Sequence, residues 1–357
     1  MKLSPQTILN VLLVFVPMPI IGKWLDWPSL FIFLTACLGI VPLAGLMGKA
    51  TETLADRLGA GPGGLLNATF GNACELLIAL SALRAGLIDV VKASITGSII
   101  GNILLVLGFA MLAGGLKYKT QYFNRTAATT SATLLALAAV CLVVPTVFHY
   151  SGPAVSHDHE DDLALAISAV QMTVYFLSLY FSLKTHKSLY VREVDHEVHE
   201  AMGTTGWGMK ISVAVLFGAT IMVAILSECL VGEVEHTAST FGMSQLFIGV
   251  ILVAIIGNAA EHSTAILMAM KNKMDLSINI ALGSSSQIAL FVAPVIVFAS
   301  FIMGKPMNLV FSEFEVMSVV VSVFILPFVA TDGECNWLEG VQLLAVYAVL
   351  GLTFFLI

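Results

Sequence analysis

The sequence predicts an all-α membrane protein of about eleven transmembrane helices, arranged as two inverted five-helix repeats plus an extra N-terminal helix. Composition predicts the membrane location, because 58% of the 357 residues are hydrophobic and only 11% are charged, with a mean hydropathy of +0.95. A soluble domain of this size does not tolerate that balance. The number of apolar runs and an internal repeat predict the rest of the architecture.

Apolar runs of about 20 residues, the length that crosses a bilayer, predict the eleven spans. They cover roughly residues 7–22, 28–50, 64–85, 90–114, 126–148, 162–183, 208–231, 245–269, 276–302, 312–331 and 337–357. Residues 1–22 also resemble a signal peptide, but no convincing small-residue cleavage site follows. We therefore interpret them as a short first span.

One long hydrophilic stretch, residues 184–207, divides the chain into halves. The resulting domains are an N-terminal helix (1–27), a first five-helix repeat (28–183), an acidic cytoplasmic linker (184–207) and a second five-helix repeat (208–357). Because five is an odd number, the second half enters the membrane in the opposite orientation. This arrangement is an inverted-topology repeat.

Lysine and arginine residues predict which way the chain is inserted, because cytoplasmic loops are enriched in them. Eleven fall on the N-terminal side of the predicted membrane and four on the other side. The first group is Lys2, Arg57, Lys117, Lys119, Arg125, Lys184, Lys187, Arg192, Lys210, Lys271 and Lys273, and the second is Lys23, Arg84, Lys92 and Lys305. We expect the N terminus in the cytoplasm and the C terminus outside the cell or in a lumen.

Several classes of function are disfavoured by composition. Basic residues are few and scattered, so nucleic-acid binding is not expected. The five cysteines contain no C-x-x-C pair and lie mostly in apolar runs, so neither a disulfide framework nor a zinc site is predicted. No nucleophile and base lie within reach of each other, so we do not expect an enzyme, and we predict no cofactor.

Residues 65–108 and 251–294 are related by a constant offset of 186 residues without a gap, and 12 of these 44 positions are identical. This is far more than chance gives, so we infer a duplication. Both copies hold the motif Gly-Asn-Ala-x-Glu, at residues 71–75 and 257–261. Polar motifs at corresponding places of two membrane-embedded halves indicate a transport site near the bilayer midplane.

Glu75 and Glu261 are the central candidates, since a carboxylate inside a membrane is costly and is normally kept for work on ions or protons. Asn72 and Asn258 lie three residues earlier, on the same helix face. The carboxylates, the amide oxygens and carbonyls freed by local unwinding suit a hard cation such as Ca²⁺, which accepts six to eight oxygen ligands. We expect the two copies to form one shared site.

The next span of each half adds more polar side chains, namely Ser98 and Asn102 in the first half and Ser284 and Gln287 in the second. Such side chains often serve only as hydrogen-bonding contacts between helices. The matched pair Ser98 and Ser284 is the better ligand candidate, because the repeat preserves it.

His262 breaks the symmetry of the repeat, because Leu76 stands at the equivalent place of the first half. A histidine in a membrane span can simply satisfy a neighbour's hydrogen bond. Beside a cation-binding carboxylate it suits proton handling, since imidazole titrates near neutral pH.

Further carboxylates suit the periphery of the site. Glu52 and Glu235 each precede a glycine by seven residues, and we interpret them either as entrance carboxylates for ions or as solvated helix ends. Residues 157–162 and 193–200 are acidic clusters, which are either solvated loops or segments that attract cations.

A coupling mechanism follows from the two glutamates. An empty site would leave two unpaired anions in a low dielectric, and protonation relieves this state. Either a cation or about two protons would then occupy the site, and exchange results when only loaded forms alternate between inward-open and outward-open states. The spans at 28–50 and 208–231 are the predicted gates.

At these residues the sequence resembles the cation/proton exchanger family, the Ca²⁺/H⁺ antiporters of the cation/Ca²⁺ exchanger superfamily. The marks of the resemblance are LLNATFGNACE (65–75), GSIIGN (97–102), IIGNAAEH (255–262) and GSSSQ (283–287). The resemblance implies Ca²⁺ transport driven by a proton gradient and gating by the first helix of each repeat. It also implies cation ligation by Glu75, Glu261, Asn72, Asn258, Gln287, Ser98 and Ser284 and a proton-linked role for His262.

Two alternatives are kept beside a Ca²⁺/H⁺ antiporter: a Na⁺- or K⁺-coupled exchanger of the same fold and, less favoured, a cation channel. The expected partners are Ca²⁺ and H⁺ as substrates and the lipid bilayer, while self-association stays open. We expect the cell (inner or plasma) membrane, with the vacuolar membrane as the alternative.

Overall fold

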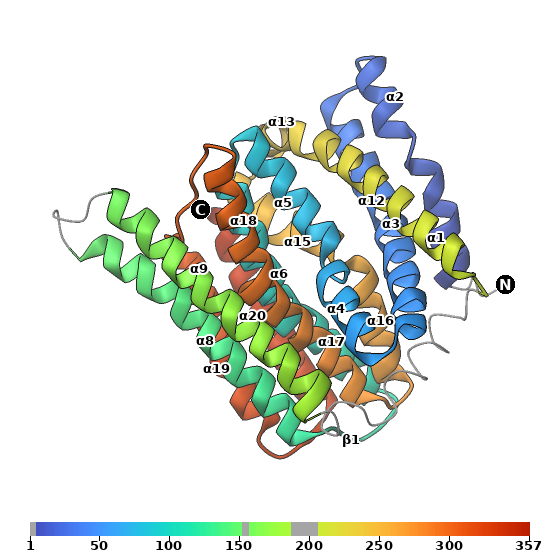
Figure 1. The fold of residues 1–357 in the computed structure, drawn as a ribbon, viewed down its shortest axis with the longest axis vertical. Coiled ribbons are helices and arrows are strands. Elements are labelled where there is room, and N and C mark those ends of the chain that lie inside the picture. The colour runs from blue at the N-terminus through green and yellow to red at the C-terminus, as the bar shows by residue number, and fades with distance from the viewer. Residues whose placement is uncertain (1–4, 152–156, 187–205) are drawn as a thin grey trace. The chain divides into compact units, whose positions relative to one another are not determined.

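The computed structural model describes residues 5–151, 157–186 and 206–357, which are almost entirely helical (Figure 1). The chain forms two compact units, each of which is described by itself. Unit 1 comprises residues 1–94, 203–260 and 354–357, and unit 2 comprises residues 95–202 and 261–353. Each unit therefore combines elements from both halves of the sequence.

Unit 1 holds the helices that begin each half of the chain. From the first half come α1 (Pro5–Leu12), η1 (Leu13–Phe15), α2 (Met18–Trp24), α3 (Ser29–Leu58), α4 (Ala60–Phe70), α5 (Ala73–Ala85) and the start of α6 (Ile88–Ile100). From the second half come α12 (Met209–Gly232), α13 (Val234–Phe241), α14 (Gln245–Phe247), η4 (Ile248–Val253), α15 (Ala254–Gly257) and the start of α16 (Ala259–Met270).

Unit 2 holds the remainder of each half. From the first half come the end of α6, η2 (Gly101–Val106), α7 (Leu107–Gly115), β1 (Gln121–Tyr122), α8 (Arg125–Tyr150), α9 (His157–Tyr180) and η3 (Phe181–Thr185). From the second half come most of α16, α17 (Met274–Gln287), η5 (Ile288–Val292), α18 (Ala293–Ile302), α19 (Glu313–Ala330), β2 (Glu334–Cys335) and most of α20 (Trp337–Leu356). The elements η2, η3, η4 and η5 are π-helical turns.

The number of membrane-spanning helices differs from the predicted eleven. Among the described residues, eight helices are long and apolar enough to cross a membrane, or up to ten if each of two bent helix pairs is one span. The apolar helix at 9–24 is too short to be among them, because the predicted first span is divided into α1, η1 and α2 near Pro17. Interruptions within predicted spans therefore account for the difference.

Close packing of α3 on α12, the first helices of the two halves, forms the core of unit 1. Gly39 makes this approach possible, since a Cβ at this position would lie 2.8 Å from Cδ2 of Leu226. The helix α3 continues through Glu52 and ends at Leu58, and the next residue, Gly59, has a φ of +79°, which glycine adopts without strain. By contrast, α12 ends at Gly232, so Glu235 lies on the separate helix α13.

In unit 2, α8 and α19 pack against each other and run in opposite directions, as equivalent helices of an inverted repeat do (Figure 1). The strand β1 before α8 pairs antiparallel with β2 after α19. At the other end, the backbone N–H of Phe311 donates to Oγ1 of Thr146 over 3.2 Å. The start of each helix thus lies beside the end of the other.

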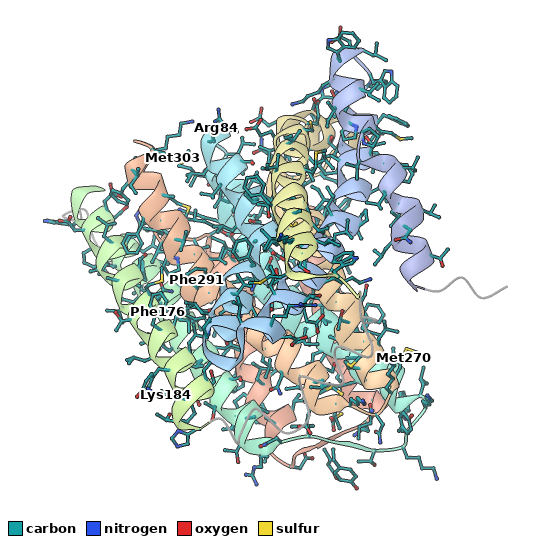
Figure 2. All side chains as sticks on the ribbon, turned by 45° about the vertical axis from the view of Figure 1, so that its right-hand side comes forward. Arg84, Phe176, Lys184, Met270, Phe291 and Met303 are labelled. Atoms are coloured by element: carbon teal, nitrogen blue, oxygen red, sulfur yellow. The ribbon has the colours of Figure 1, made fainter. Side chains whose placement is uncertain are left out.

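One end of unit 2 gathers several lysines. Lys117 donates to the carbonyl of Met270 over 3.1 Å, which places Lys117 beside the turn that carries Lys271 and Lys273. Lys184 and Met270 lie at this end and Met303 lies at the opposite one (Figure 2). The first end is called the basic end below. Its assignment to the cytoplasm stays a prediction.

Candidate functional site

Both copies of the Gly-Asn-Ala-x-Glu motif lie at interruptions of a helix. In the first copy α4 ends at Phe70, α5 begins at Ala73, and the two helices meet at an angle of 44°. In the second copy α15 ends at Gly257 and α16 begins at Ala259. The sequence predicted continuous spans at 64–85 and 245–269 but proposed local unwinding at the glycines, and the structure places both breaks beside them.

The asparagines form the breaks. Asn72 has φ −103° and ψ 27°, and Asn258 has φ −93° and ψ 3°, so neither residue continues an α-helix. The side chain Nδ2 of Asn258 donates over 2.9 Å to the carbonyl of Ala254, the first residue of the four-residue helix α15. Both asparagines are buried, with exposed fractions of 2% and 1%.

The motif glutamates both lie in the first turn of the helix that follows the break. At this position the N-terminal end of the helix dipole stabilises a negative charge. Each break therefore presents a carboxylate next to backbone groups that the interrupted helix leaves without regular partners. Glu75 belongs to unit 1 and Glu261 to unit 2, so the expectation that they share one site stays a prediction.

In unit 1, Glu75 of the first motif lies against Gly257 of the second motif. A Cβ at Gly257 would be 3.2 Å from Cγ of Glu75 and 3.4 Å from its Oε1. Only a glycine leaves this space for the carboxylate without a shift of the neighbours. The second motif thus contributes its backbone at Gly257 to the surroundings of the first motif's glutamate.

In unit 2, Glu261 accepts a hydrogen bond from the hydroxyl of Ser284. Its other oxygen, Oε2, is buried and has no hydrogen-bond partner among the described residues. A buried carboxylate oxygen without a partner is costly unless a proton or a cation neutralises it. The structure therefore brings together two of the predicted ligands and leaves one carboxylate oxygen available.

The helices α6 and α17, which carry Ser98 and Ser284, approach each other at equivalent positions of the repeat. The hydroxyl of Ser285 lies 3.5 Å from the carbonyl of Ile99, and these two residues are separated by the repeat offset of 186. Ser98 is buried, with 3% of its surface exposed. Gln287 is half-buried and ends α17, directly before the π-helical turn η5.

The histidine has a partner that the sequence did not reveal. Nε2 of His262 and Oδ1 of Asn102 are 2.9 Å apart, and because an amide oxygen only accepts, Nε2 carries the hydrogen. Neither residue is preserved in the repeat, since Leu76 and Ile288 stand at the equivalent positions. The pair is therefore a polar contact that only one half of the duplication possesses.

The peripheral candidates differ from one another in their surroundings. Glu52 is half-buried on α3, whereas Glu235 is exposed on α13, where it accepts from Nε2 of Gln245 over 3.4 Å. The acidic cluster at 193–200 lies outside the described residues. Within the described residues, no three His, Cys, Asp or Glu side chains gather into a metal-binding group.

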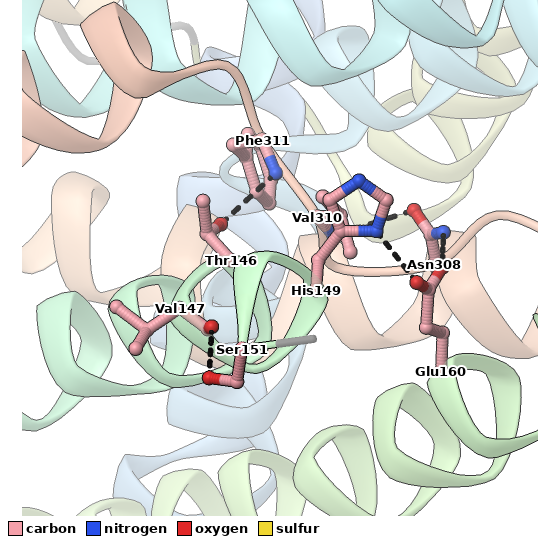
Figure 3. Close-up of polar contacts among 8 residues, drawn as sticks. All are labelled: Thr146, Val147, His149, Ser151, Glu160, Asn308, Val310 and Phe311. Carbon is pink, nitrogen blue, oxygen red and sulfur yellow. Dashed lines mark hydrogen bonds and ion pairs between the residues drawn. The ribbon is translucent and has the colours of Figure 1, made fainter. Parts of the chain in front are cut away.

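Glu160 is the best-defined member of the acidic cluster at 157–162. It is buried, with Oε1 2.6 Å from Nδ1 of His149, while Oε2 accepts from Nδ2 of Asn308 over 3.1 Å (Figure 3). The carboxylate thus connects α8, α9 and the loop before α19. Glu160 is therefore a buried structural contact, whereas the sequence suggested either a solvated loop or a segment that attracts cations.

Comparison with known families places these observations in context. The model of the family described as "Sodium/calcium exchanger protein" matches residues 28–184 and 211–356. A Ca(2+)/H(+) antiporter of Aphanothece halophytica is 49% identical over 99% of this chain and 97% of its own length. The Ca(2+)/H(+) antiporter ChaA of Bacillus subtilis is 46% identical over 96% and 97%, respectively.

A more distant relative and two solved structures also match this chain over most of its length. The vacuolar calcium ion transporter of Schizosaccharomyces pombe is 39% identical over 97% of this chain and 84% of its own length. The structure of native YfkE is 43% identical, covers 98% of this chain and 100% of its own, and superimposes with a TM-score of 0.85. The H+/Ca2+ exchanger CAX, at 15% identity over 98% of this chain and 91% of its own, shares the fold with a TM-score of 0.71. The chain is therefore an integral membrane protein of the sodium/calcium exchanger protein family, and its resemblance to the cation/proton exchangers is confirmed.

Proposed function

We propose that this protein is a secondary active antiporter that exchanges Ca²⁺ for H⁺ by alternating access. The observation that carries the proposal is the placement of a glutamate in the first turn after a buried helix break in both copies of one motif. The names of relatives that are 46% to 49% identical over nearly the whole chain support Ca²⁺ and H⁺ as the substrates.

The proposed cation ligands combine charge with neutral oxygens. Glu75, Asn72 and Asn258 contribute from unit 1, and Glu261, Ser98, Ser284 and Gln287 contribute from unit 2. Ca²⁺ accepts carboxylate, amide, hydroxyl and backbone carbonyl oxygens in loose geometry, which this set offers. Mg²⁺ demands a strict octahedron and retains its water, so it suits the set less well.

Ca²⁺ transport would be coupled to proton transport because a buried carboxylate that binds neither a cation nor a proton is energetically unfavourable. Oε2 of Glu261 has no hydrogen-bond partner in the part of the chain that the structure describes, which supports this idea, because that atom gains a partner from either a bound cation or its own proton. Ca²⁺ and protons would then compete for Glu75 and Glu261, and only loaded forms of the protein would change their access. Such competition exchanges one ion for the other without further components.

His262 is the proposed proton-handling residue beside Glu261. With Nε2 donating to Asn102, the ring is held in one orientation and its Nδ1 is the nitrogen that accepts a proton.

We propose α3 and α12 as the moving gates, with Glu52 and Glu235 as entrance carboxylates. The N terminus would lie in the cytoplasm, in the inner or plasma membrane of the cell.

The test is Ca²⁺ uptake into liposomes that contain the purified protein under an imposed pH gradient. Glu75→Gln and Glu261→Gln should each lower the uptake rate at least a hundredfold, because an amide can neither bind nor release the exchanged proton. Glu313→Gln is the matched control, since Glu313 is exposed on α19 and should leave uptake unchanged. Near-normal exchange by either motif variant would contradict the proposal.

The same liposomes separate the alternatives. Uptake driven by a Na⁺ or K⁺ gradient at equal pH on both sides would identify a monovalent-coupled exchanger. Ca²⁺ flux that needs no counter-ion and does not saturate would identify a channel. Neither outcome is expected, because two neutralisable glutamates favour obligatory exchange with protons.

A further inference from the structure

The π-helical turn η5 leaves one backbone carbonyl without a donor from its own helix. In a regular α-helix the carbonyl of Ala289 would accept the N–H of Ala293, but that N–H is bonded to Ile288, five residues earlier. In the π-helical pattern the next donor would come from residue 294, which is proline and has no N–H. The carbonyl of Ala289 therefore needs a donor from elsewhere.

Gln171 of α9 supplies this donor. Its Nε2 donates to the carbonyl of Ala289 over 3.2 Å, and the side chain is completely buried. One turn further along α9, Tyr175 stacks on Phe291 of η5 with ring centroids 5.1 Å apart. Phe291 and Phe176, the residue after Tyr175, both lie between the two ends of unit 2 (Figure 2).

The position of this contact connects it to the candidate site. Ala289 lies two residues after Gln287, the last residue of α17, and η5 continues directly from that helix. A π-helical turn changes the direction of side chains before and after it, and such turns are frequent at functional sites. A neighbour that satisfies the freed carbonyl stabilises the turn and so fixes where Gln287 points.

We propose that Gln171 is a positioning residue for ion exchange, which holds the π-helical turn η5 and through it the amide of Gln287. The proposal rests on the proposed function for the role of Gln287 but not for the contact itself. A purely structural Gln171 would stabilise the protein without any specific link to Gln287. The two cases differ in what a second substitution at Gln287 does.

The test is a double-mutant cycle of Gln171→Met and Gln287→Ala in liposomes, with the initial rate of Ca²⁺ uptake measured against Ca²⁺ concentration. Gln171→Met keeps the length and shape of the side chain but removes the donor. We expect the half-saturating Ca²⁺ concentration to rise about fivefold, the factor typical of one lost hydrogen bond. In the Gln287→Ala background the same change should add almost nothing, because the residue to be positioned is gone.

Ser168→Ala is the matched control. Ser168 lies three residues before Gln171 on the same buried face of α9, and its hydroxyl has no hydrogen-bond partner among the described residues. This variant should leave the half-saturating concentration unchanged. An equal rise in the control, or a full fivefold rise on top of Gln287→Ala, would overturn the proposal.

Hydrogen–deuterium exchange of the backbone amides in residues 288–293 measures how well Gln171 stabilises η5, and it does not require a transport assay. Gln171→Met should speed exchange in this segment, and unchanged exchange would overturn the proposal even if the wild-type protein transports Ca²⁺ normally. Conversely, a wild-type protein without Ca²⁺ uptake would refute the proposed function and leave the contact intact. If Gln171→Met does not fold, Gln171→Asn, which shortens the reach of the donor by one methylene, replaces it with the same expected direction.

Discussion

Two of the π-helical turns of unit 2, η2 and η5, stand at nearly equivalent places in the repeat, yet different neighbours hold them. After η2, the backbone of α7 packs directly on α20, since a Cβ at Gly108 would lie 3.1 Å from the carbonyl of Gly340. At the position equivalent to Gly108, the segment after η5 has Pro294, and the side chain of Gln171 bonds the carbonyl that this proline leaves free.

The side chains within the two turns differ as well. Asn102 lies in η2 and binds His262, whereas the equivalent position in η5 is the apolar Ile288. The duplication therefore kept the backbone plan, with a helix break at each motif and a π-helical turn in the following helix. Each half then acquired its own polar contacts around that plan. Under the proposed function, the symmetric parts would bind the ion and the asymmetric parts would handle protons.

The largest expected effect comes from disturbing the backbone contact beside η2. A Cβ at Gly340 would lie 2.5 Å from the backbone N of Leu112 and 2.7 Å from the carbonyl of Gly108, so α7 and α20 would have to separate. Gly340→Ala should lower the free energy of unfolding by about 3 kcal/mol, the upper part of the range for overpacking. Thermal unfolding of the detergent-solubilised protein measures this loss.

Gly218→Ala is the control for that prediction. Gly218 lies in α12 with no neighbouring atom within 4 Å of an added Cβ, so the substitution should be neutral or slightly stabilising. Equal unfolding temperatures for the Gly340 and Gly218 variants would show that η2 does not depend on this close packing. In that case, the conclusion that backbone packing of α7 on α20 holds η2 would be wrong.

Much of this architecture could be predicted from the sequence because it depends on patterns within one stretch of chain. The apolar runs predicted helices in nearly all the right places, and the repeat singled out the motifs that hold Glu75 and Glu261, with local unwinding as one of two readings of their glycines. Ser284 was predicted as a ligand from its match with Ser98, and it does bond Glu261. Local periodicity and duplication are both visible in a single sequence.

The contacts that could not be predicted join residues far apart in the chain. His262 and Asn102 are separated by 160 residues and Gln171 and Ala289 by 118, and no local pattern relates either pair. Gln171 did have a signal, since it is a large polar residue in an apolar span. The π-helical turn that it serves depends on tertiary packing, which hydrophobic periodicity does not report.

A middle-sized effect is expected from making the two halves alike at the His262–Asn102 contact. Asn102→Ile and His262→Leu introduce the residues that the other half has at these places, Ile288 and Leu76. Each single change leaves a buried polar group without its partner and should cost about 2 kcal/mol of unfolding free energy. The double variant removes both groups and should be close to the wild-type protein, since two apolar groups replace the pair.

Thermal unfolding of the four proteins measures the coupling energy of this pair. We expect the double variant to recover about 4 kcal/mol relative to the sum of the single changes, which cost about 2 kcal/mol each. Strictly additive losses would mean that His262 and Asn102 do not depend on each other. In that case the asymmetry between the halves would be one of sequence only.

The smallest effect concerns the two ends of unit 2. At the basic end, β1 pairs with β2, and Nε2 of Gln121 donates to the carbonyl of Ala269 over 2.8 Å. At the opposite end, Glu160 alone joins His149 to Asn308 (Figure 3). A partly exposed contact of this kind contributes less than a backbone ladder, because water can replace its hydrogen bonds.

Glu160→Ala should therefore lower the free energy of unfolding by only about 1 kcal/mol. Its local effect should be larger, because Asn308 then loses the acceptor that fixes the loop before α19, and amide exchange in residues 303–312 should become faster. Asp162→Ala is the matched control, since Asp162 is exposed on the same helix and should change neither measurement. If both variants behave alike, Glu160 does not hold the end opposite the basic end, and that end depends on its other contacts, such as the hydrogen bond between Phe311 and Thr146.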